Sequence, residues 1–494
     1  MTASTYNVLD YGAVADGKIS STQAINRAIE ACASAGGGTV VVPPGAFLSG
    51  PVILRSNVTF HLEAGAILLA SANLEDYPHE RDGANMESVR VGLVTARHAE
   101  NVSITGKGII DGSGYHFVVP KTRHTGPDFN PRFTRQGEDF QHPRFGTQHG
   151  PWTHTGDRPG SVVCFFECRN VHIQGVTIAN SPTWTVHINH CEIVTIHGVR
   201  IHSMGSDRRV PNDDGIDLRF SRRVHISDCD FEVGDDCVAV FSSQEIVVTN
   251  CTMRSRSAGV RIGYDECDIR DCVFSNLVIH SNRGLNICLR GEGNIENILF
   301  QNIVMHTALV SGHWWGKAEP VHISTGHLRD DGKPLGRIRH VRFANIVAES
   351  EAGILISGCP ESPIEDVRFD SIRLLVKNSP LHDSYGGNFD LRALADLPRA
   401  LYQHDIPALF AEYTRGLQVH GANVDWEAGL PEYFTHAVQC ENFADLTLAD
   451  FQGSAARPGL APAVLAHGKN ACLRDCRFEG GSPLIDQVEG MSIK

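Results

Sequence analysis

The chain repeats one short pattern of polar and apolar positions over most of its length. In each repeat a turn residue precedes an alternation of apolar and polar residues, which is followed by Gly or Asn and a second alternation. The repeats begin at Asn57, Asn101, Asn170, Ile193, Val224, Ile246, Ile269, Asn294, Ile338 and Ile364. From Ile193 onward the spacing is mostly 22 to 31 residues. Each repeat predicts two or three strands of about four residues. Such strands are too short to form a core alone, so successive repeats must stack as coils of a parallel β-helix.

The ends and interruptions of this pattern predict the rest of the organisation. In residues 20–35 (SSTQAINRAIEACASA) apolar residues recur at helical spacing after two serines, so we expect a helix that covers the N-terminal end of the core. Residues 1–50 would form this cap and the first strands. Residues 113–160 lack any period and predict an inserted surface loop, and residues 379–415 predict a helical excursion before the C-terminal coils. Because the strand pattern then resumes, we expect residues 1–494 to form a single domain.

The chain contains 14 cysteines but no C-x-x-C pair, so we expect reduced thiols rather than a metal or redox site. Five of them recur at separations of 23, 38, 22 and 21 residues, close to the coil period: Cys168, Cys191, Cys229, Cys251 and Cys272. This spacing predicts one inward-facing ladder of small residues.

Charge and composition narrow the classes of partner. There are 43 basic and 57 acidic residues, a net charge of −14, and basic residues are scattered. This balance argues against nucleic acid or a membrane surface as partner and leaves a small or polymeric substrate. The first residues lack the basic start and apolar stretch of a secretion signal, so we expect a cytoplasmic protein.

Two acidic clusters stand out, Asn212-Asp213-Asp214-Gly215-Ile216-Asp217 and Gly234-Asp235-Asp236-Cys237. Asp214 and Asp236 are 22 residues apart, one coil of the predicted helix, so they should lie one above the other, about 4.8 Å apart. Carboxylates held this close repel each other, which favours a shared proton, and glycoside hydrolysis needs one protonated and one ionised carboxyl group. Turn formation is the alternative for each cluster alone. A calcium site is a competing interpretation of both together.

These motifs resemble glycoside hydrolase family 28, the polygalacturonases and related pectin-cleaving enzymes. The similarity runs from Tyr6 to about residue 375 and includes Asp111-GSG, Asn180-SPTWTVHI and the two acidic motifs. It implies an all-β, right-handed parallel β-helix of the pectin-lyase-like type, and hydrolysis by direct displacement with inversion. It also implies that Asp235 is the general acid, that Asp214 and Asp236 activate water, and that Asn212 orients substrate or carboxylate. The roles of Asp213 and Asp217 stay open, Asp217 being more plausibly a supporting residue.

The chain departs from the family pattern at three basic positions. Ala258 stands where the family usually has His, and Asn286 and Cys288 stand where it has Arg and Lys. That Arg and Lys pair normally holds the uronate carboxylate beside the cleaved bond. Either Arg261 and Arg290 supply a relocated carboxylate-binding pair, or a neutral or deoxy sugar lies beside that bond.

The segment 312–320 (GHWWGKAEP) predicts further sugar contacts. Aromatic faces stack on sugar rings, and Lys and Glu bind hydroxyl groups. We therefore expect Trp314, Trp315, Lys317 and Glu319 to bind substrate, with one of the two tryptophans packing against the coils.

The sequence as a whole predicts an inverting, polygalacturonase-like glycoside hydrolase that degrades imported pectic or related oligosaccharides, acts from the chain end and needs no cofactor or metal. One alternative is a calcium-dependent polysaccharide lyase on the same fold. Another is a β-helix protein that binds carbohydrate without cleaving it, since fold alone does not specify function.

Overall fold

The structure is a computed structural model of the chain, and it describes residues 4–79, 88–120, 130–141, 152–154, 156–202, 212–265, 267–311 and 315–494. The chain divides into two compact units. Unit 1 comprises Met1–Lys121 and Pro151–Thr252, and unit 2 comprises Thr122–Gly150 and Met253–Lys494. The prediction of one domain over the whole chain therefore stays a prediction, and each unit is described separately.

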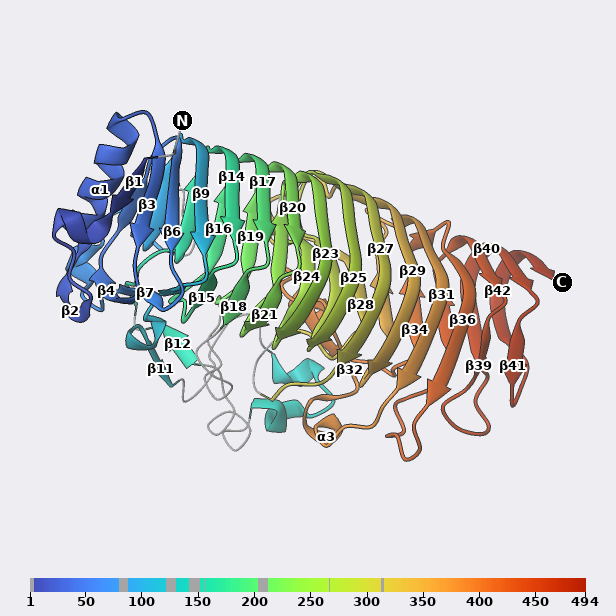
Figure 1. Ribbon diagram of the computed structural model, residues 1–494. Helices are drawn as coiled ribbons and strands as arrows, with labels where there is room; N and C mark the ends of the chain where they lie inside the picture. Colours follow the sequence, from blue (N-terminus) through green and yellow to red (C-terminus); the bar gives the residue numbers. More distant parts are fainter. Residues whose placement is uncertain are drawn as a thin grey trace. The chain divides into compact units, whose positions relative to one another are not determined.

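Unit 1 is a parallel β-helix whose coils each contribute one strand to each of three sheets (Figure 1). The first sheet contains β5 (Val52–Leu54), β8 (Val94–Arg97), β13 (Val163–Phe166), β16 (Val186–Asn189), β19 (Ile216–Arg219) and β22 (Val238–Phe241). The second contains β1 (Thr5–Asn7), β3 (Gly38–Val42), β6 (Val58–Leu62), β9 (Glu100–Gly106), β14 (Arg169–Gln174), β17 (Glu192–His197), β20 (Arg222–Ser227) and β23 (Gln244–Ser255). The third contains β2 (Asp16–Ser20), β4 (Gly45–Ser49), β7 (Ala66–Ala70), β10 (Ile109–Asp111), β15 (Thr177–Ala179), β18 (Arg200–His202) and β21 (Asp230–Val233).

The corners between the first and second sheets explain the turn residues of the sequence pattern. Asn57, Asn101 and Asn170 occupy one corner with φ of 62°, 53° and 55°, in the left-handed region that Asn tolerates better than most residues. Their side chains form a ladder, because Asn101 Nδ2 donates to Asn57 Oδ1 at 2.9 Å and Asn170 Nδ2 donates to Asn101 Oδ1 at 2.8 Å. The same amide thus sharpens the bend and ties neighbouring coils together.

The expected N-terminal helix is present as α1 (Thr22–Ser34), which follows the N-cap residue Ser21. Its buried face carries Ala24, Ile25, Ala28, Ile29 and Cys32. In Figure 1 the helix lies beside the first strands of unit 1, as a cap of the core requires. The Ser21 hydroxyl does not cap the helix; it bonds the backbone of Val14 instead.

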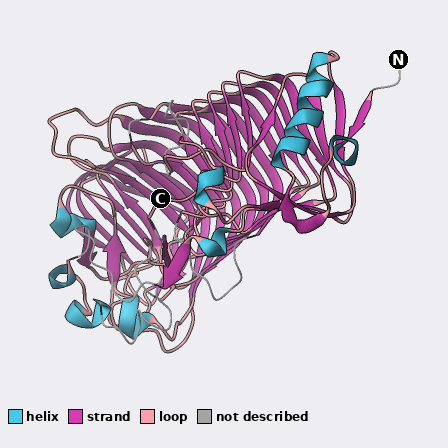
Figure 2. Ribbon diagram, turned by 90° about the vertical axis from the view of Figure 1, so that its left-hand side faces the viewer, coloured by secondary structure: helices cyan, strands magenta, loops and turns pink. Residues whose placement is uncertain are grey.

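Unit 2 is also built of stacked parallel strands, and Figure 2 shows how strongly strands outweigh helices. One series contains β24 (Ala258–Gly263), β26 (Arg283–Leu289), β28 (Val321–Thr325), β30 (Ile354–Ser357), β34 (Leu409–Glu412) and β37 (Val438–Glu441). A second series of mostly longer strands contains β25 (Ile269–Ser281), β27 (Asn294–Thr307), β29 (Arg337–Ser350), β31 (Ile364–Val376), β36 (Gln418–Trp426) and β38 (Ala444–Ala449). The last coils add β35 (Thr414–Arg415), β39 (Gln452–Ser454), β40 (Ala463–Arg474), β41 (Arg477–Glu479) and β42 (Leu484–Ile493).

The two predicted interruptions differ in structure. The described part of residues 113–160 contains the antiparallel pair β11 (Val118–Pro120) and β12 (Trp152–His154), the 3-10 turn η3 (Gly114–His116), and η4 (Pro131–Phe133) and η5 (Gly137–Gln141), which belong to unit 2. In residues 379–415 the helical expectation needs correction, because only α3 (His382–Tyr385) and α4 (Leu397–Ala400) are helical. An antiparallel hairpin of β32 (Asn388–Asp390) and β33 (Leu401–Gln403) joins them, and the coil strand β34 has begun by Leu409.

The cysteines are thiols, but they do not form one ladder. The N–H of Cys168 donates to Cys191 Sγ at 3.4 Å, and that of Cys191 donates to Ser221 Oγ at 3.0 Å, so serine continues the row. Cys229 and Cys251 interact with each other at a different corner. Cys272 lies in register with Ile298 inside unit 2. Small size at a corner, rather than sulfur, is what the position requires.

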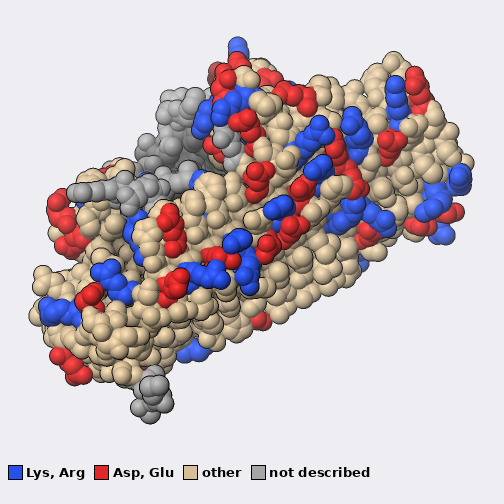
Figure 3. Space-filling view, turned by 90° about the horizontal axis from the view of Figure 1, so that it is seen from above, with Lys and Arg blue, Asp and Glu red and all other residues tan. Residues whose placement is uncertain are grey.

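Polar contacts between coils continue on the outside. Glu192 on β17 pairs with Arg169 on β14 and with Arg222 on β20. Acidic and basic side chains are interspersed on the face shown in Figure 3. Among the described residues, none of the helices combines the length and the apolar character needed to cross a membrane.

Inside unit 2 a column of phenylalanines fills the core. Phe274, Phe300, Phe343 and Phe369 come from consecutive long strands, and their ring centroids lie 5.0, 5.1 and 4.6 Å apart. All four side chains are fully buried. Stacked aromatic rings at this separation stabilise the core beyond their apolar burial.

We therefore expect Phe343→Ala to lower the free energy of unfolding by about 3–5 kcal/mol, because the variant loses two ring contacts and leaves a cavity. Val347→Ala is the matched control, since Val347 lies on the same strand and is 42% exposed, and it should change stability by less than about 0.5 kcal/mol. Urea unfolding followed by circular dichroism measures both. If the two substitutions lowered the free energy of unfolding equally, the stacked phenylalanine rings would not be a special source of stability.

Candidate active site

The structure brings three of the predicted acids together in unit 1. Carboxylate oxygens of Asp214, Asp235 and Asp236 all lie within 4.8 Å of one another. Asp214 and Asp236 are buried, with 2% and 3% exposure, and Asp235 is half-buried. The proximity follows from coil stacking, because the N–H of Gly215 donates to the carbonyl of Asp236 at 2.8 Å across the two coils.

Backbone contacts fix the third acid. Asn212 adopts φ of 61°, and its N–H donates to Asp235 Oδ2 at 3.0 Å, while the N–H of Asp236 donates to Asp235 Oδ1 at 3.0 Å. Asn212 thus contacts the acids through its backbone amide, and its expected role in orienting substrate or carboxylate stays a prediction. Two donors on one carboxylate hold it in place and stabilise its negative charge.

The floor beneath the acids is tightly packed. A Cβ at Gly215 would lie 2.4 Å from the carbonyl oxygen of Cys237 and 2.8 Å from the ring of Phe231, so only glycine fits there. Burial, together with the charges of Asp236 and Asp214, raises the pKa of the Cys237 thiol well above its usual range. Cys237 thus stays a neutral, uncharged support for the acidic cluster.

His187 on β16 had not been singled out from the sequence. It is fully buried and lies in register with Asp217 on β19. Its ring meets that of Trp184 edge to face, with the two ring centroids 5.0 Å apart. Burial, with Arg219 and His190 nearby, lowers the pKa of His187 to about 3, so the imidazole is neutral. The sequence pattern of residues 180–188 places His187 on the outward side of its strand. That pattern does not say which residues of the neighbouring coils lie beside it.

Three carboxylates in this arrangement could also hold a cation. Oxygen donors are those that Ca²⁺ prefers, although Ca²⁺ takes six to eight oxygen ligands. The cluster offers one ligand atom from each of Asp214, Asp235 and Asp236. Its chemistry thus fits either proton transfer or a cation that completes its shell with water or substrate.

Among the predicted substrate-binding residues of unit 2, Arg261 and Trp315 lie at an aromatic cluster. The Arg261 guanidinium lies 5.7 Å from the ring centroid of Tyr264, and Tyr264 stacks on Trp315 at 5.7 Å with an interplanar angle of 25°. Arg261 and Trp315 are half-buried. Trp314 lies outside the described residues. Tyr264 had not been singled out from the sequence, because it follows β24 in a turn without a repeating pattern.

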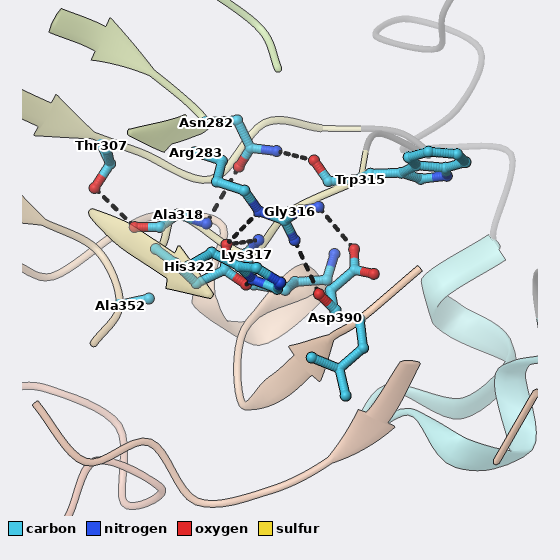
Figure 4. A network of polar contacts seen from close by, with 12 residues as sticks. Asn282, Arg283, Thr307, Trp315, Gly316, Lys317, Ala318, His322, Ala352 and Asp390 are labelled. Atoms are coloured by element: carbon cyan, nitrogen blue, oxygen red, sulfur yellow. Dashed lines mark hydrogen bonds and ion pairs between the residues drawn. The ribbon is translucent and has the colours of Figure 1, made fainter. Parts of the chain in front are cut away.

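Lys317 and Glu319 do not lie at the surface, which corrects their expected role in sugar binding. They are 5% and 2% exposed, and Lys317 is part of the network shown in Figure 4. Glu319 Oε2 accepts from the Lys317 N–H at 2.7 Å and from Arg283 Nε at 3.3 Å. The ring of Trp315 points away from this network in Figure 4. In the same loop, Trp315 therefore faces one way, and the charged residues Lys317 and Glu319 face the other.

Asp390 closes the network from the hairpin of residues 388–403. Its carboxylate accepts from the Gly316 N–H at 2.7 Å and from Arg392 Nη2 at 2.7 Å, and its carbonyl accepts from Arg283 Nη2 at 2.9 Å. The neighbouring guanidinium groups keep the pKa of Asp390 well below its usual range despite burial, which alone would raise it. The hairpin is thus held on β26 and the loop before β28 by charge.

Arg290 is also structural, contrary to the expected carboxylate-binding pair. It is 2% exposed, and its guanidinium donates to Ser324 Oγ and to the carbonyls of Leu391 and Ala393, at 2.8, 2.8 and 2.9 Å. Asn286 and Cys288 are each 4% exposed. Of the two arginines considered as a relocated pair, only Arg261 keeps a half-exposed side chain.

Lys317 carries a testable electrostatic signature. Its ammonium lies 4.5 Å from the ring centroid of Phe140 on η5 and 5.7 Å from that of Tyr385 on α3. Lys317 thus contacts both elements. Burial lowers the pKa of Lys317 from 10.5 to about 7, and Arg392 and Arg283 act in the same direction against Asp390 and Glu319.

Between pH 7 and 10 the unfolded chain therefore holds a proton on Lys317 that the folded chain lacks, so wild-type stability should rise with pH relative to Lys317→Met. The difference in unfolding free energy should change by up to about 1.4 kcal/mol per pH unit. Urea unfolding at pH 6, 7.5 and 9 measures it. Lys469→Met is the control, because Lys469 is 71% exposed, and its difference should stay flat. If the difference in unfolding free energy between wild type and Lys317→Met did not change with pH, the lowered pKa of Lys317 would be contradicted.

Comparison with known proteins identifies the family. The sequence profile of Glycosyl hydrolases family 28 matches residues 32–376. A polygalacturonase from Prunus persica is 26% identical over 77% of this chain and 89% of its own length. An exo-poly-alpha-D-galacturonosidase from Dickeya chrysanthemi is 26% identical over 60% of this chain and 54% of its own length.

Solved structures agree on the fold. An exopolygalacturonase from Thermotoga maritima is 27% identical, with a TM-score of 0.59 over 76% of this chain and 87% of that one. A family 28 exopolygalacturonase from Yersinia enterocolitica is 18% identical, with a TM-score of 0.64 over 91% of this chain and 78% of that one. The stacked coils, the paired acidic motifs and the profile match together show that the chain belongs to glycosyl hydrolases family 28 and is a glycoside hydrolase.

Proposed function

We propose that this hydrolase cleaves glycosidic bonds of pectic or related oligosaccharides at Asp214, Asp235 and Asp236. The observation that carries the proposal is the set of three carboxylates within 4.8 Å on two successive coils. A protein that only binds sugar gains nothing from holding like charges together, whereas hydrolysis needs an acid and a base at one bond.

The roles follow from family position and exposure. Asp235, the half-buried member, donates a proton to the leaving oxygen. Asp214 and Asp236, both buried, accept a proton from the attacking water. The two N–H groups that hold Asp235 stabilise its ionised form, whereas the two neighbouring carboxylates repel it.

Unit 2 by itself carries a group that suits an acidic sugar. Arg261 with Tyr264 and Trp315 combines a cation with stacked rings, which suits a sugar that bears a carboxylate. Action from the chain end is supported by the relatives named as exopolygalacturonases. Asn286 and Cys288 carry no positive charge, which supports a substrate sugar other than galacturonate.

We also propose a cytoplasmic location. The support is that the structure pairs none of the cysteines in a disulfide and buries twelve of them, since structural disulfides are typical of oxidising compartments. In that location the substrates would be imported oligosaccharides rather than intact polymers. Fractionation of cells followed by immunodetection would check the location.

The assignment of the acid predicts a specific pattern of loss. Asp235→Asn should reduce turnover of oligosaccharides by about 10²–10⁴-fold while leaving their binding nearly intact, because the asparagine cannot donate the proton. An aryl glycoside with a dinitrophenol leaving group should lose much less, since that group departs without protonation. Asp214→Asn, which removes a water-activating group, should slow both substrates alike. Unimpaired hydrolysis of oligosaccharides by Asp235→Asn would refute the role of Asp235.

The first product distinguishes inversion from retention and hydrolysis from elimination. Carboxyl groups usually lie about 6.5–9.5 Å apart in inverting enzymes and about 5 Å apart in retaining ones. The spacing here would by itself favour retention, whereas the family resemblance implies inversion. We expect anomeric NMR to show a first product with the opposite configuration to the bond cleaved.

The products of the same reaction also distinguish hydrolysis from the lyase alternative. That alternative arises because the three carboxylates could hold a cation. A lyase would need calcium and would give an unsaturated product that absorbs in the ultraviolet. We expect unchanged rates in a chelator and no such absorbance, with a new reducing end for each bond cleaved. Calcium dependence with an absorbing product would replace hydrolysis by elimination.

A further inference from the structure

Two pairs of cysteines in unit 1 occupy like positions on successive coils. One pair is Cys168 with Cys191, and the other is Cys229 with Cys251. Each cysteine directly follows an exposed corner residue in the left-handed region; these are Glu167, His190, Asp228 and Asn250, with φ of 51°, 53°, 56° and 56°. Because the same bend recurs in both coils of a pair, the two thiols lie one above the other.

Backbone contacts show this stacking for the first pair. The N–H of Cys168 donates to Cys191 Sγ at 3.4 Å, and the N–H of Glu192 donates to the carbonyl of Cys168 at 3.0 Å. The next residue, Arg169, lies in register with Glu192. Residues stacked in this way on parallel strands lie about 4.8 Å apart, and a disulfide needs Cα atoms about 4.4–6.8 Å apart. The first pair can therefore be bridged without a change of register.

The second pair repeats the arrangement one corner further on. The N–H of Thr252 donates to the carbonyl of Cys229 at 3.1 Å, which is the bond equivalent to that of the first pair. A disulfide between Cys229 and Cys251 would close a coil whose two ends are 22 residues apart in the sequence. Asp235 and Asp236 lie within that coil, so this pair would fasten the coil that carries two of the acids.

Within each pair the two thiols differ in their tendency to ionise. A hydrogen bond from the Cys191 thiol lowers the pKa of Cys168, whereas burial and the same hydrogen bond raise the pKa of Cys191. A hydrogen bond from the Cys251 thiol likewise lowers the pKa of Cys229, and that bond together with burial raises the pKa of Cys251. Each pair thus combines a thiol suited to attack an oxidant with a second thiol in position to complete a disulfide.

All four cysteines lie just below the surface. Their side chains are only 1–2% exposed, but the corner residue before each of them is exposed. The residues that follow three of them, Arg169, Asp230 and Thr252, are exposed as well. A small oxidant therefore has to pass only the side chains of one corner to reach the sulfur.

We propose that Cys168 with Cys191, and Cys229 with Cys251, are dithiol sites that a hydroperoxide oxidises to disulfides between successive coils. This inference is independent of the proposed function, because it concerns the thiols alone. The sequence does not reveal these sites, since the partners lie 23 and 22 residues apart instead of in a C-x-x-C motif.

The reaction balances with hydrogen peroxide as the oxidant. The thiolate of one cysteine attacks a peroxide oxygen, the O–O bond breaks, and a sulfenic acid and hydroxide form; the hydroxide takes up a proton and becomes water. The partner thiol then loses its proton, and its sulfur attacks the sulfenic sulfur. The S–S bond forms as the S–O bond breaks, and a second water leaves. The two thiols lose two electrons, which reduce the peroxide to two waters.

Cys440 provides an internal control in the same chain. It is fully buried, and burial raises the pKa of its thiol to about 12. Ala411 and Leu465 occupy the like positions on the coils before and after it. Cys440 therefore has the burial of the paired cysteines without a stacked thiol, and it should stay reduced.

The experiment maps the thiols after mild oxidation. The reduced protein is treated with hydrogen peroxide, unfolded in N-ethylmaleimide to alkylate the remaining thiols, digested without reduction and analysed by mass spectrometry. We expect linked peptides for Cys168–Cys191 and Cys229–Cys251, alkylated Cys440, and loss of both links after dithiothreitol.

Serine variants test the consequence for the coils. Cys191→Ser/Cys251→Ser removes one member of each pair, and serine suits such a place because Ser221 continues the row beside Cys191. Oxidation should make the wild-type protein resist thermolysin about tenfold longer or more, because each disulfide restricts the unfolded chain. The double variant and Cys440→Ser separate the effect: the first should gain no resistance, and the second should gain as much as the wild type. Circular dichroism checks that each variant is folded.

Three results would overturn the inference. The first is that peroxide leaves all four cysteines alkylated by N-ethylmaleimide. The second is that Cys440 is oxidised as readily as the four paired cysteines. The third is that the paired cysteines end as sulfinic acids without linked peptides, since a stacked partner should capture the sulfenic acid before further oxidation.

Discussion

Hydrogen bonding between parallel strands in constant register is the constraint on which the rest of this structure depends. Each coil bonds to the next with side chains of like position one above the other, about 4.8 Å apart. A residue type repeated at the coil period therefore becomes a row in space. The asparagine ladder and the phenylalanine column are two products of the same rule. In unit 1, the close approach of Asp214 to Asp236 is a third.

This constraint explains which parts of the molecule were predictable from the sequence. The fold class, the N-terminal helix and the meeting of Asp214 with Asp236 depend on period and spacing, which the sequence displays directly. The predicted single cysteine ladder was wrong, because cysteines at the same spacing occupy different corners of the coils. Within one of those corners, serine takes the place of cysteine. Spacing predicts which residues can stack, whereas register decides which of them do.

Loops were less predictable, since nothing in their sequence fixes the direction of a side chain. In residues 315–319, Trp315 faces outward while Lys317 and Glu319 face inward, to charges that come from residues 283 and 390–392. A lysine in a polar loop is ordinarily solvated, and only the distant hairpin turns this one into a buried group. Arg290 is a similar case, because two of its partners, the carbonyls of Leu391 and Ala393, lie about a hundred residues further along the chain. His187 was missed for the opposite reason: its strand was predicted, but its neighbours on adjacent coils were not.

The acidic cluster shows why burial and register must be considered together. Asp235 accepts two backbone N–H groups, an arrangement that favours a carboxylate, yet the family position assigns it the proton. Asp214 and Asp236 lie beside Asp235 and are nearly inaccessible to water, which strengthens the repulsion between the carboxylates at close range. The raised pKa of Cys237 keeps its thiol neutral, so it adds no further negative charge to the cluster. The coil spacing thus forces the three acids together, and the proposed reaction takes its proton from the half-buried one.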